Sequence, residues 1–550
     1  MIELTYHLAE LPSVQHRAGL AGLVLMVQEL SRYPEFADRE GVVLEFSELE
    51  DPHATLQVNE AGLQALFDFT YSATLDERHT DKKIKKYDRV EEIETTDKKG
   101  KPKTIQRYYY SVVVPKGAFL ADWDKSGDEN NAGLWIKLWR DMLWTIIRGI
   151  PTTRKSYDER VEGKPPYTKD VTETWKALQT PEKLTGQRSQ YYLGAMTINP
   201  ENIPTQDTVA HQFLLHFWVY VAQVYCPAIL NKDGKREISG YVLAIPDVAN
   251  LVDFCDEFKD VLNQREPHSY GYRPREAIID LPEEGGLELM RLMCERISRR
   301  TGNQTLADLI LGVEVIHAEK VGNVVKIRSL NYVEPLTRQV DRYAEIKKAY
   351  WCPWFRKQRL LNLLHSTPES PETDAPLQEL PAWLEFDALL SRIPRKWLQD
   401  PYFNHDAREL FKNEIPQNGE NAMTTEIRHY AEIVYRVCQH YVLSKLNSKY
   451  GLDWKECQGK PKKEQEYNDK KTKIANDAFL AVRSRTEAQI FIEYFVSTLY
   501  PYIRKEEFPD FAETLFNQTH EIRALTLLGL SSQFSSSKKT DQSNTSNNAA

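Results

Sequence analysis

The hydrophobic pattern of the chain changes at residues 366–381, STPESPETDAPLQELP, a proline- and acid-rich segment typical of a linker. Before it, strand-like and helix-like patterns follow one another without the regular alternation of a doubly wound sheet. We therefore predict an α+β domain over residues 1–365. After it, apolar residues recur at helical spacing in three segments, which predicts a C-terminal helical bundle over residues 382–530. The Ser- and Asn-rich tail, residues 531–550, is predicted to be disordered.

Local patterns predict individual elements within the first domain. Residues 41–49 and 237–248 are typical of strands, and residues 133–147 carry apolar side chains at helical spacing. Residues 85–114 predict two strands joined by a tight basic turn. Residues 311–333 predict a second hairpin, which turns at Gly322-Asn323.

One apolar segment, residues 213–230, is long enough to cross a membrane. It contains His216, Gln223 and Pro227, and it lacks a flanking pattern of Lys and Arg. We interpret it as a buried, aromatic-rich helix and expect no contact with a membrane.

Composition is that of a globular protein, with 41% hydrophobic and 27% charged residues. The net charge is −9, but contact with a phosphate backbone depends on local tracks of Lys and Arg rather than on whole-chain charge. The six cysteines form no C-x-x-C pair, which argues against a zinc ribbon and a disulfide scaffold. The N-terminus lacks the basic region of a secretory signal, so we expect a cytoplasmic protein with reduced thiols.

Motifs of familiar enzyme classes are missing from the sequence. It has no G-x-x-x-x-G-K-[ST], G-x-G-x-x-G, H-E-x-x-H or G-x-S-x-G sequence. The adjacent His405 and Asp406 suggest a metal hydrolase, but no second set of His and Asp accompanies them, and we interpret them as a surface pair. We expect a protein that binds rather than cuts, with no catalytic residue, metal or cofactor.

Positive charge gathers in the turn of the first predicted hairpin and in the loop 147–169. A basic hairpin tip can enter a groove or grip phosphates, because each Lys or Arg releases counterions on binding. A solvated loop is the alternative interpretation. The residues that we assign to duplex backbone are Lys98, Lys99, Lys101, Lys103, Arg107, Arg154 and Lys155.

Two further segments carry side chains suited to nucleic acid. Residues 184–204 combine amide and guanidinium groups of the kind that read base edges, although such groups also cap loops. We assign groove contacts there to Gln187, Arg188, Ser189, Asn199 and Asn202. Within the helical bundle, a basic track for a single strand is predicted from Lys462, Lys463, Lys470, Lys471, Arg483 and Arg485.

Five phrases of the sequence, taken in order, resemble the large subunit of type I CRISPR effector complexes (Cascade), in the type I-B / Myxan-subtype branch. They are LAELPSVQHRAGLAGLVL, GQRSQYYLGAMTINPENIP, HQFLLHFWVYVAQVY, SGYVLAIPDVANLVDF and LGVEVIHAEKVGNVVKI. The resemblance covers about residues 3–340 and continues weakly through the helical end. These phrases are typical of the family but are not catalytic signatures.

The resemblance implies a non-catalytic subunit of a prokaryotic RNA-guided complex. Such a subunit reads the protospacer-adjacent motif (PAM) on double-stranded DNA, separates the strands to start the R-loop, and helps hold the displaced strand. The implied partners are crRNA, target DNA, the backbone and 5′-end-capping subunits, and a helicase-nuclease or, in transposon-encoded relatives, transposition proteins. Two alternatives stay open: a metal-dependent nuclease built on His405-Asp406, and a scaffold that contacts only proteins and crRNA.

The apolar helix predicted to start after Ser13 begins with three polar residues, Gln15, His16 and Arg17. Its small residues Ala18, Gly19, Ala21 and Gly22 predict close packing of the apolar face. We expect the polar tip to be exposed and to contact crRNA or a neighbouring subunit. Helix capping and a surface charge are the alternative.

Met423 is the one methionine after residue 293, and it follows a polar loop just before the bundle. In relatives of this subtype the small subunit is often made by internal initiation within the large-subunit gene. An equivalent start at Met423 would give residues 423–550 as a separate small subunit. A methionine in a loop that starts nothing is the alternative.

Overall fold

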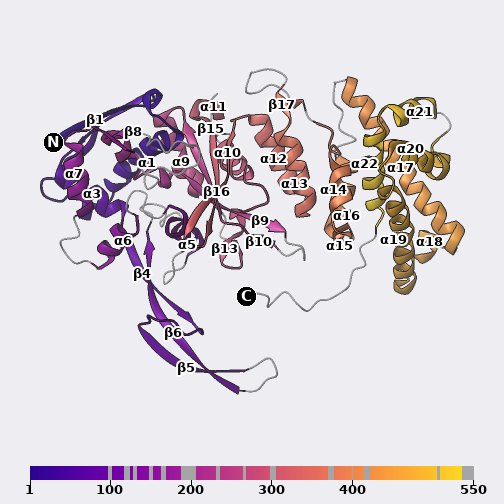
Figure 1. The fold of residues 1–550 in the computed structure, drawn as a ribbon, viewed down its shortest axis with the longest axis horizontal. Helices are drawn as coiled ribbons and strands as arrows, with labels where there is room; N and C mark the ends of the chain where they lie inside the picture. The colour runs from indigo at the N-terminus through magenta and orange to yellow at the C-terminus, as the bar shows by residue number, and fades with distance from the viewer. Residues whose placement is uncertain are drawn as a thin grey trace. The chain divides into compact units, whose positions relative to one another are not determined.

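The computed structural model describes residues 1–96, 102–116, 124–127, 133–147, 153–162, 169–186, 206–230, 236–263, 265, 268–297, 305–368, 377–378, 380–398, 400–413, 422–504 and 508–534. The chain divides into two compact units, Met1–Val340 and Asp341–Ala550. Unit 1 mixes strands and helices, and unit 2 is helical apart from two short paired strands (Figure 1). The α+β fold followed by a helical bundle is confirmed. The described part of the predicted linker belongs to unit 2.

The largest sheet of unit 1 has the strand order β10-β9-β11-β15-β16, with the short β14 beside β9. Its strands are β9 (Gln223–Leu230), β10 (Arg236–Ile238), β11 (Tyr241–Val248), β14 (Ile278–Ile279), β15 (Ile310–Val321) and β16 (Val324–Val333). The predicted hairpin is β15–β16, and Gly322 takes a φ of +62° in its turn, a conformation that glycine adopts without strain. Helix α10 (Glu284–Ile297) lies against this sheet. A Cβ on its Gly286 would be only 3.1 Å from Val315 and Val333.

Helix α1 (Val14–Leu30) is the centre of unit 1, and every residue in it except Arg17 and Gln28 is buried. The small residues allow a very close approach to the segment that follows α8 (Val209–Leu214). A Cβ on Gly19 would lie 2.5 Å from the Leu214 carbonyl oxygen, and one on Gly22 would lie 2.2 Å from that of Phe217. The predicted close packing of α1 is confirmed.

A smaller antiparallel sheet, in the order β1-β3-β2, also belongs to unit 1. It consists of β1 (Ile2–His7), β2 (Leu44–Leu49) and β3 (His53–Val58), and α3 (Glu60–Thr70) follows it. The strand predicted within residues 41–49 is therefore confirmed.

Residues 213–228 are buried, as predicted, but the segment 213–230 does not form one helix. They contain the end of α8, a 3-10 turn over Trp218–Tyr220 and strand β9. Strand β9 pairs with β10 and β11, so its backbone is satisfied by the sheet. Periodicity could not show this, because a segment that is buried on all sides has the same apolar pattern in a strand and in a helix. No helix in the described part of the chain has the length and apolar character needed to cross a membrane.

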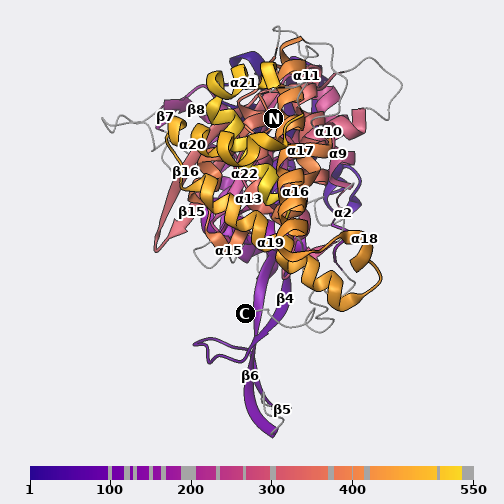
Figure 2. The same cartoon turned by 90° about the vertical axis from the view of Figure 1, so that its right-hand side faces the viewer.

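Three long strands form an arm on unit 1, with β6 (Pro102–Pro115) between β4 (Ala73–Thr80) and β5 (Arg89–Thr96). The arm projects away from the rest of unit 1 in both views (Figures 1 and 2). The sequence predicted the β5–β6 hairpin but missed β4. The predicted helix at 133–147 is α5 (Leu134–Met142), continued by a π-helical turn over Leu143–Ile147.

Unit 2 is built around α22 (Thr519–Ser531), which is buried over most of its length. Helices around it include α14 (Phe386–Arg392), α16 (Pro401–Asn413), α17 (Ala422–Tyr450), α19 (Pro461–Arg483), α20 (Ala488–Tyr494) and α21 (Phe508–Asn517). The buried Arg523 of α22 donates hydrogen bonds to the carbonyls of Arg485 (2.8 Å) and Arg483 (3.0 Å) and pairs with Asp387. It thereby satisfies carbonyls that the end of α19 leaves open. Phe534, which the sequence assigned to the tail, is buried with its ring 6.0 Å from that of Phe479.

Candidate nucleic-acid interface

The arm carries a cluster of lysines that sequence reasoning did not assign. Strand β4 pairs with residues 108–115 of β6, and β5 pairs with residues 102–109 on the other side of β6. The connection 81–88, which joins β4 to β5, therefore begins and ends beside Tyr108 and Tyr109. It exposes Lys82, Lys83, Lys85 and Lys86. None of these four lysines forms an ion pair within the described chain. The repeated pair in DKKIKKYD was the signal available in the sequence; we call these residues the mid-arm lysines.

The strands of the arm are joined at this point by side chains as well as by backbone. Arg89 of β5 lies with its guanidinium carbon 3.8 Å from the ring centroid of Tyr109 on β6, and it donates to Glu77 of β4 at 2.9 Å. The hydrogen bond from Arg89 lowers the pKa of Glu77. One guanidinium thus links all three strands beside the mid-arm lysines.

The predicted backbone-binding residues are placed in part. Lys103 is exposed on β6, whereas Arg107 is 26% exposed and bonds to Asp81 at 3.0 Å. Arg154 and Lys155 are each 67% exposed on α6 (Thr153–Glu162) and form pairs with residues four positions later. Exposed pairs of this kind are weak, so they do not prevent contact with phosphate. Lys98, Lys99 and Lys101 lie outside the described residues.

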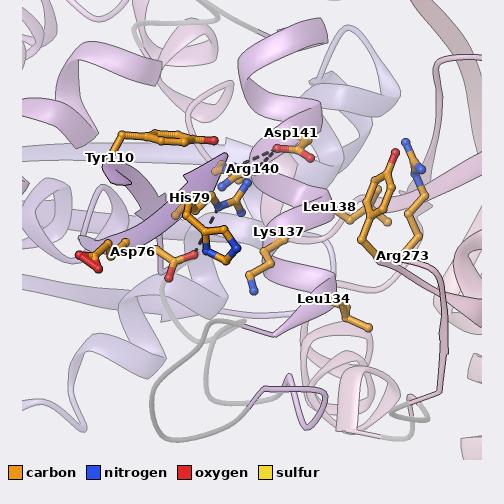
Figure 3. A pocket seen from close by; sticks show the side chains of 12 residues that line it. Asp76, His79, Tyr110, Leu134, Lys137, Leu138, Arg140, Asp141 and Arg273 are labelled. Carbon is orange, nitrogen blue, oxygen red and sulfur yellow. Dashed lines mark hydrogen bonds and ion pairs between the residues drawn. The ribbon is translucent and has the colours of Figure 1, made fainter. Parts of the chain in front are cut away.

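A cavity of about 500 Å³ lies where the arm joins unit 1 (Figure 3). Strands β4 and β6 line one part of it, and α5 and the β12–β13 turn (Ser269–Pro274) line the rest. Its lining mixes aromatic rings with both signs of charge. The polar and aromatic residues are Asp76, Glu77, Arg78, His79, Tyr110, Lys137, Arg140, Asp141, Tyr272 and Arg273. Part of this charge is internally paired, since Arg78 lies 3.5 Å from Asp76 and Arg140 bonds to Asp141.

The groove-contact residues Gln187, Arg188, Ser189, Asn199 and Asn202 all lie outside the described residues. The two strands that bracket them are described: β7 (Leu184–Gly186) pairs antiparallel with β8 (Gln206–Thr208). Asp207 of β8 is buried and accepts hydrogen bonds from His16 of α1 and His211 of α8, each at 2.9 Å. Burial alone would raise the pKa of Asp207, but the two histidines outweigh it and hold the pKa well below its usual range. The base of the predicted groove-reading segment is therefore anchored to the central helix.

The polar start of α1 is not exposed, so our prediction of a free polar tip is wrong. Gln15 and His16 are 0% and 1% exposed, and His16 also bonds to Ser13 through Nδ1 at 2.7 Å. Arg17 pairs with Asp247 of β11 and donates to the Leu11 carbonyl at 3.2 Å. These side chains fix α1 in the core, where burial of unpaired polar groups would be costly.

Beside Arg17 lies a second carboxyl, that of the partly buried Glu314 on β15. Burial, together with the nearby charge of Asp247, raises the pKa of Glu314 to about 7, although a hydrogen bond with Gln15 opposes the shift. Tyr332 of β16 donates to Asp247 at 2.9 Å and completes the cluster.

The residues predicted to form a single-strand track are of two kinds: some are exposed, and others make contacts within the bundle. Lys462 and Lys463 are exposed in the first turn of α19, and Lys470 lies over the ring of Tyr450 at 5.0 Å. Burial and the neighbouring Arg408 lower the pKa of Lys471. At the other end of the helix, Arg483 donates to the carbonyl of Ser391 at 2.8 Å, and Arg485 lies over Tyr494 at 4.5 Å. These last two side chains are partly exposed, but their groups are engaged within the bundle.

His405 and Asp406 are not the surface pair that we predicted. Asp406 is 0% exposed and accepts the backbone N–H groups of Trp351 at 2.9 Å and Cys352 at 2.6 Å. Burial raises its pKa to about 6. Among the described residues, no group of three or more His, Cys, Asp or Glu side chains is arranged to hold a metal ion.

Two family models together cover most of the chain. The type I-B CRISPR Cas8b N-terminal domain matches residues 43–303, and the type I-B CRISPR Cas8b C-terminal domain matches residues 310–533. The chain belongs to the type I-B CRISPR Cas8b family. It is therefore a large subunit of a type I-B CRISPR complex, and Cas8b membership implies a Cascade assembly with crRNA and other Cas subunits. No curated protein sequence matches it.

We predict that Asp207→Ala destabilises unit 1 of this Cas8b chain. The substitution leaves His16 buried without its acceptor, and the loss of one partner from a buried pair costs about 3–5 kcal/mol. Denaturant unfolding of the purified chain should show this loss. Asp256→Ala, at an exposed position on α9 (Leu251–Asn263), is the control and should change the free energy of unfolding by less than about 0.5 kcal/mol. Equal stability of the two variants would contradict the anchoring role.

We also predict a pH-dependent stabilisation by Glu314→Gln. Because the folded pKa of Glu314 is raised to about 7, its ionised form is disfavoured in the folded state, and folding loses stability as pH rises through 7. The neutral amide removes this cost. The gain in unfolding free energy should be larger at pH 8 than at pH 5 by roughly 2 kcal/mol. Glu45→Gln, at an exposed position on β2, should show no such difference.

Proposed function

We propose that this Cas8b subunit recognises a PAM on double-stranded DNA, starts strand separation and R-loop formation, and carries no catalytic site of its own. The mid-arm lysines are the observation that carries the proposal. They place four exposed cations, none of which forms an ion pair with another described residue, on a projecting arm that three strands and Arg89 hold together. An arm whose three strands are joined by Arg89 and which exposes positive charge suits the backbone of a duplex, where contacts set position without reading sequence.

Sequence discrimination is assigned to a different part of unit 1. Gln187, Arg188, Ser189, Asn199 and Asn202 remain the proposed groove contacts, and the β7–β8 pair with Asp207 gives their segment a fixed base. Separate surfaces for backbone and groove agree with a complex in which guide pairing supplies most of the specificity and the protein reads only a short motif. Lys103, Lys98, Lys99, Lys101, Arg107, Arg154 and Lys155 extend the proposed backbone contacts.

The helical unit is proposed to help hold the displaced strand. Of the predicted track, Lys462, Lys463 and Lys470 remain candidates, because Arg483 and Arg485 are engaged within the bundle. The buried Gln15 and His16 no longer suit a contact with crRNA, and we do not extend that role to Arg17, which pairs with Asp247. Cleavage or integration is left to a recruited partner, a helicase-nuclease or transposition proteins.

The alternatives are less well supported. A metal nuclease built on His405 and Asp406 does not suit a carboxylate that already accepts two backbone N–H groups. A scaffold restricted to proteins and crRNA would use the mid-arm lysines only on RNA phosphates, and the duplex titrations below separate it from the proposal.

The proposal predicts two separable effects on DNA binding by the assembled complex. Alanine at Lys82, Lys83, Lys85 and Lys86 together should weaken all duplexes alike by tenfold or more. It should also reduce the slope of log K against log salt concentration by about 0.9 for each phosphate that the variant no longer neutralises. Alanine at Gln187 and Arg188 should reduce the preference for the flanking motif with a small change in nonspecific binding. Titrations with duplexes that differ only in the flanking bases measure both effects.

Lys320→Ala with Lys326→Ala is a matched control, because both lysines are exposed on the β15–β16 hairpin away from the arm. This control should leave affinity and salt slope unchanged. Exchanged effects, with the mid-arm lysine variant changing motif preference and the Gln187 and Arg188 variant changing general affinity, would refute the assignment.

We further propose that internal initiation at Met423 supplies a small subunit. Helix α17 begins at Ala422, so a product that starts at Met423 keeps α17 to α22 as continuous elements. It loses the partners that precede it, including Asp387 for Arg523 and the Ser391 carbonyl for Arg483. Such a fragment would need contacts from the complex to replace them.

Mass spectrometry of the purified complex tests internal initiation. We expect a second product that begins at residue 423, and we expect Met423→Leu to remove it while the full-length chain persists. A complex that contains only the full-length chain would contradict the idea.

A further inference from the structure

Three aromatic side chains form an exposed cluster on unit 2. Trp351 lies between α12 (Thr337–Ala349) and α13 (Pro353–Leu364), and Tyr402 and His405 lie one turn apart at the start of α16. They are 59%, 55% and 43% exposed. The indole of Trp351 stacks on the ring of His405 with 5.0 Å between centroids and 14° between planes, and Tyr402 lies 6.0 Å from Trp351. We call these three residues the aromatic platform.

The platform is held by the buried carboxylate of Asp406. One oxygen accepts the N–H groups of Trp351 and Cys352, and the other lies 3.2 Å from Nδ1 of His405. Cys352 is the N-cap of α13, so this carboxylate also sits at the positive end of a helix. Asp406 therefore fixes both the backbone of Trp351 and the imidazole of His405, on which the indole stacks. Because the two rings are already held in place, less conformational entropy is lost when a ligand binds.

The segment that carries Trp351 is basic. Residues 341–364 contain six basic residues and two acidic ones. Lys348 and Lys357, on either side of Trp351 in the sequence, are exposed, and neither forms an ion pair within the described residues. Lys348 is three residues from Trp351, within about 10 Å even in an extended chain.

We propose that the aromatic platform stacks an unpaired nucleobase of a single strand whose phosphates pass Lys348 and Lys357. An exposed tryptophan stacked on a second ring offers a flat face that every base can use, and neighbouring lysines suit the backbone. A protein segment could pack on the aromatic rings, but only an acidic segment would also pair with Lys348 and Lys357. The inference rests on the proposed function in one respect: R-loop formation supplies the unpaired strand. That strand is either the displaced DNA or the guide RNA.

The test compares an oligonucleotide with bases against one without them. The purified full-length chain is titrated with a labelled single-stranded dT 20-mer and with an abasic 20-mer that keeps the phosphates. We expect Trp351→Ala to weaken binding of the dT 20-mer by about fivefold to a hundredfold and to leave the abasic strand unchanged. Trp351→Phe should retain most of the affinity. Phe516→Ala removes a side chain that is 62% exposed from α21, which has no Lys or Arg, and should have no effect.

Each other outcome would overturn the proposal. Equal weakening of both strands would indicate a loss of folding or of phosphate contacts, and no weakening would indicate a surface for a protein partner. Melting temperatures of the variants detect unfolding independently.

The assembled complex then distinguishes the source of the strand. Loss of bound guide RNA in Trp351→Ala assigns the platform to RNA, whereas retention of the guide with a less stable R-loop assigns it to displaced DNA. Failure of the proposed function can be told apart from failure of this inference. If the mid-arm lysine variant binds duplexes normally while Trp351→Ala still weakens binding of the dT 20-mer, duplex recognition by the arm is refuted and base stacking by the platform is retained.

Discussion

The burial of α1, of which only Arg17 and Gln28 are partly exposed, is the constraint on which unit 1 depends. Gly19 and Gly22 bring its backbone against the Leu214 and Phe217 carbonyls, and no larger side chain fits there. Because the helix is buried on all sides, its polar first turn must find partners inside the protein. His16 finds Asp207, and Arg17 finds Asp247. The polar residues that seemed suited to an external partner thus join the central helix to the β7–β8 pair and to the large sheet.

This arrangement separates rigid support from nucleic-acid contact. In the core around α1, His16 is paired with Asp207 and Arg17 with Asp247, and the arm extends from that core with four lysines that form no ion pair with another described residue (Figures 1 and 2). Ion pairs within a core orient elements, whereas exposed cations without partners remain available to phosphate. The same distinction applies to unit 2, where Arg523 and Arg483 bond to carbonyls while Lys462 and Lys463 face solvent.

Much of the architecture could be predicted from the pattern of apolar residues. The α+β part, the helical bundle, the β15–β16 hairpin and α5 follow from periodicities of two and 3.6, which depend only on local geometry. The family resemblance was also available from the order of short phrases, and the two domain models confirm it. By contrast, β9 was taken for a helix because burial on every side removes the periodicity that separates the two. Strand β4 and the mid-arm lysines were missed because the basic, glycine-containing sequence between β5 and β6 is a local hairpin signal, whereas β4 pairs with a part of β6 that is distant in sequence.

The sequence by itself therefore determined most helical and extended segments, with β4 and β9 as the exceptions, as well as where charge is concentrated and to which family the chain belongs. Tertiary structure alone decided which charged side chains are free. Asp406 and Asp207 are separated in sequence from the groups they bind, Trp351 and His16, by tens to hundreds of residues. Ion pairing and burial depend on distances between such segments, and no local pattern encodes those distances. That is why Gln15, His16, Arg483 and Asp406 resembled surface residues in the sequence and proved to be internal supports in the fold.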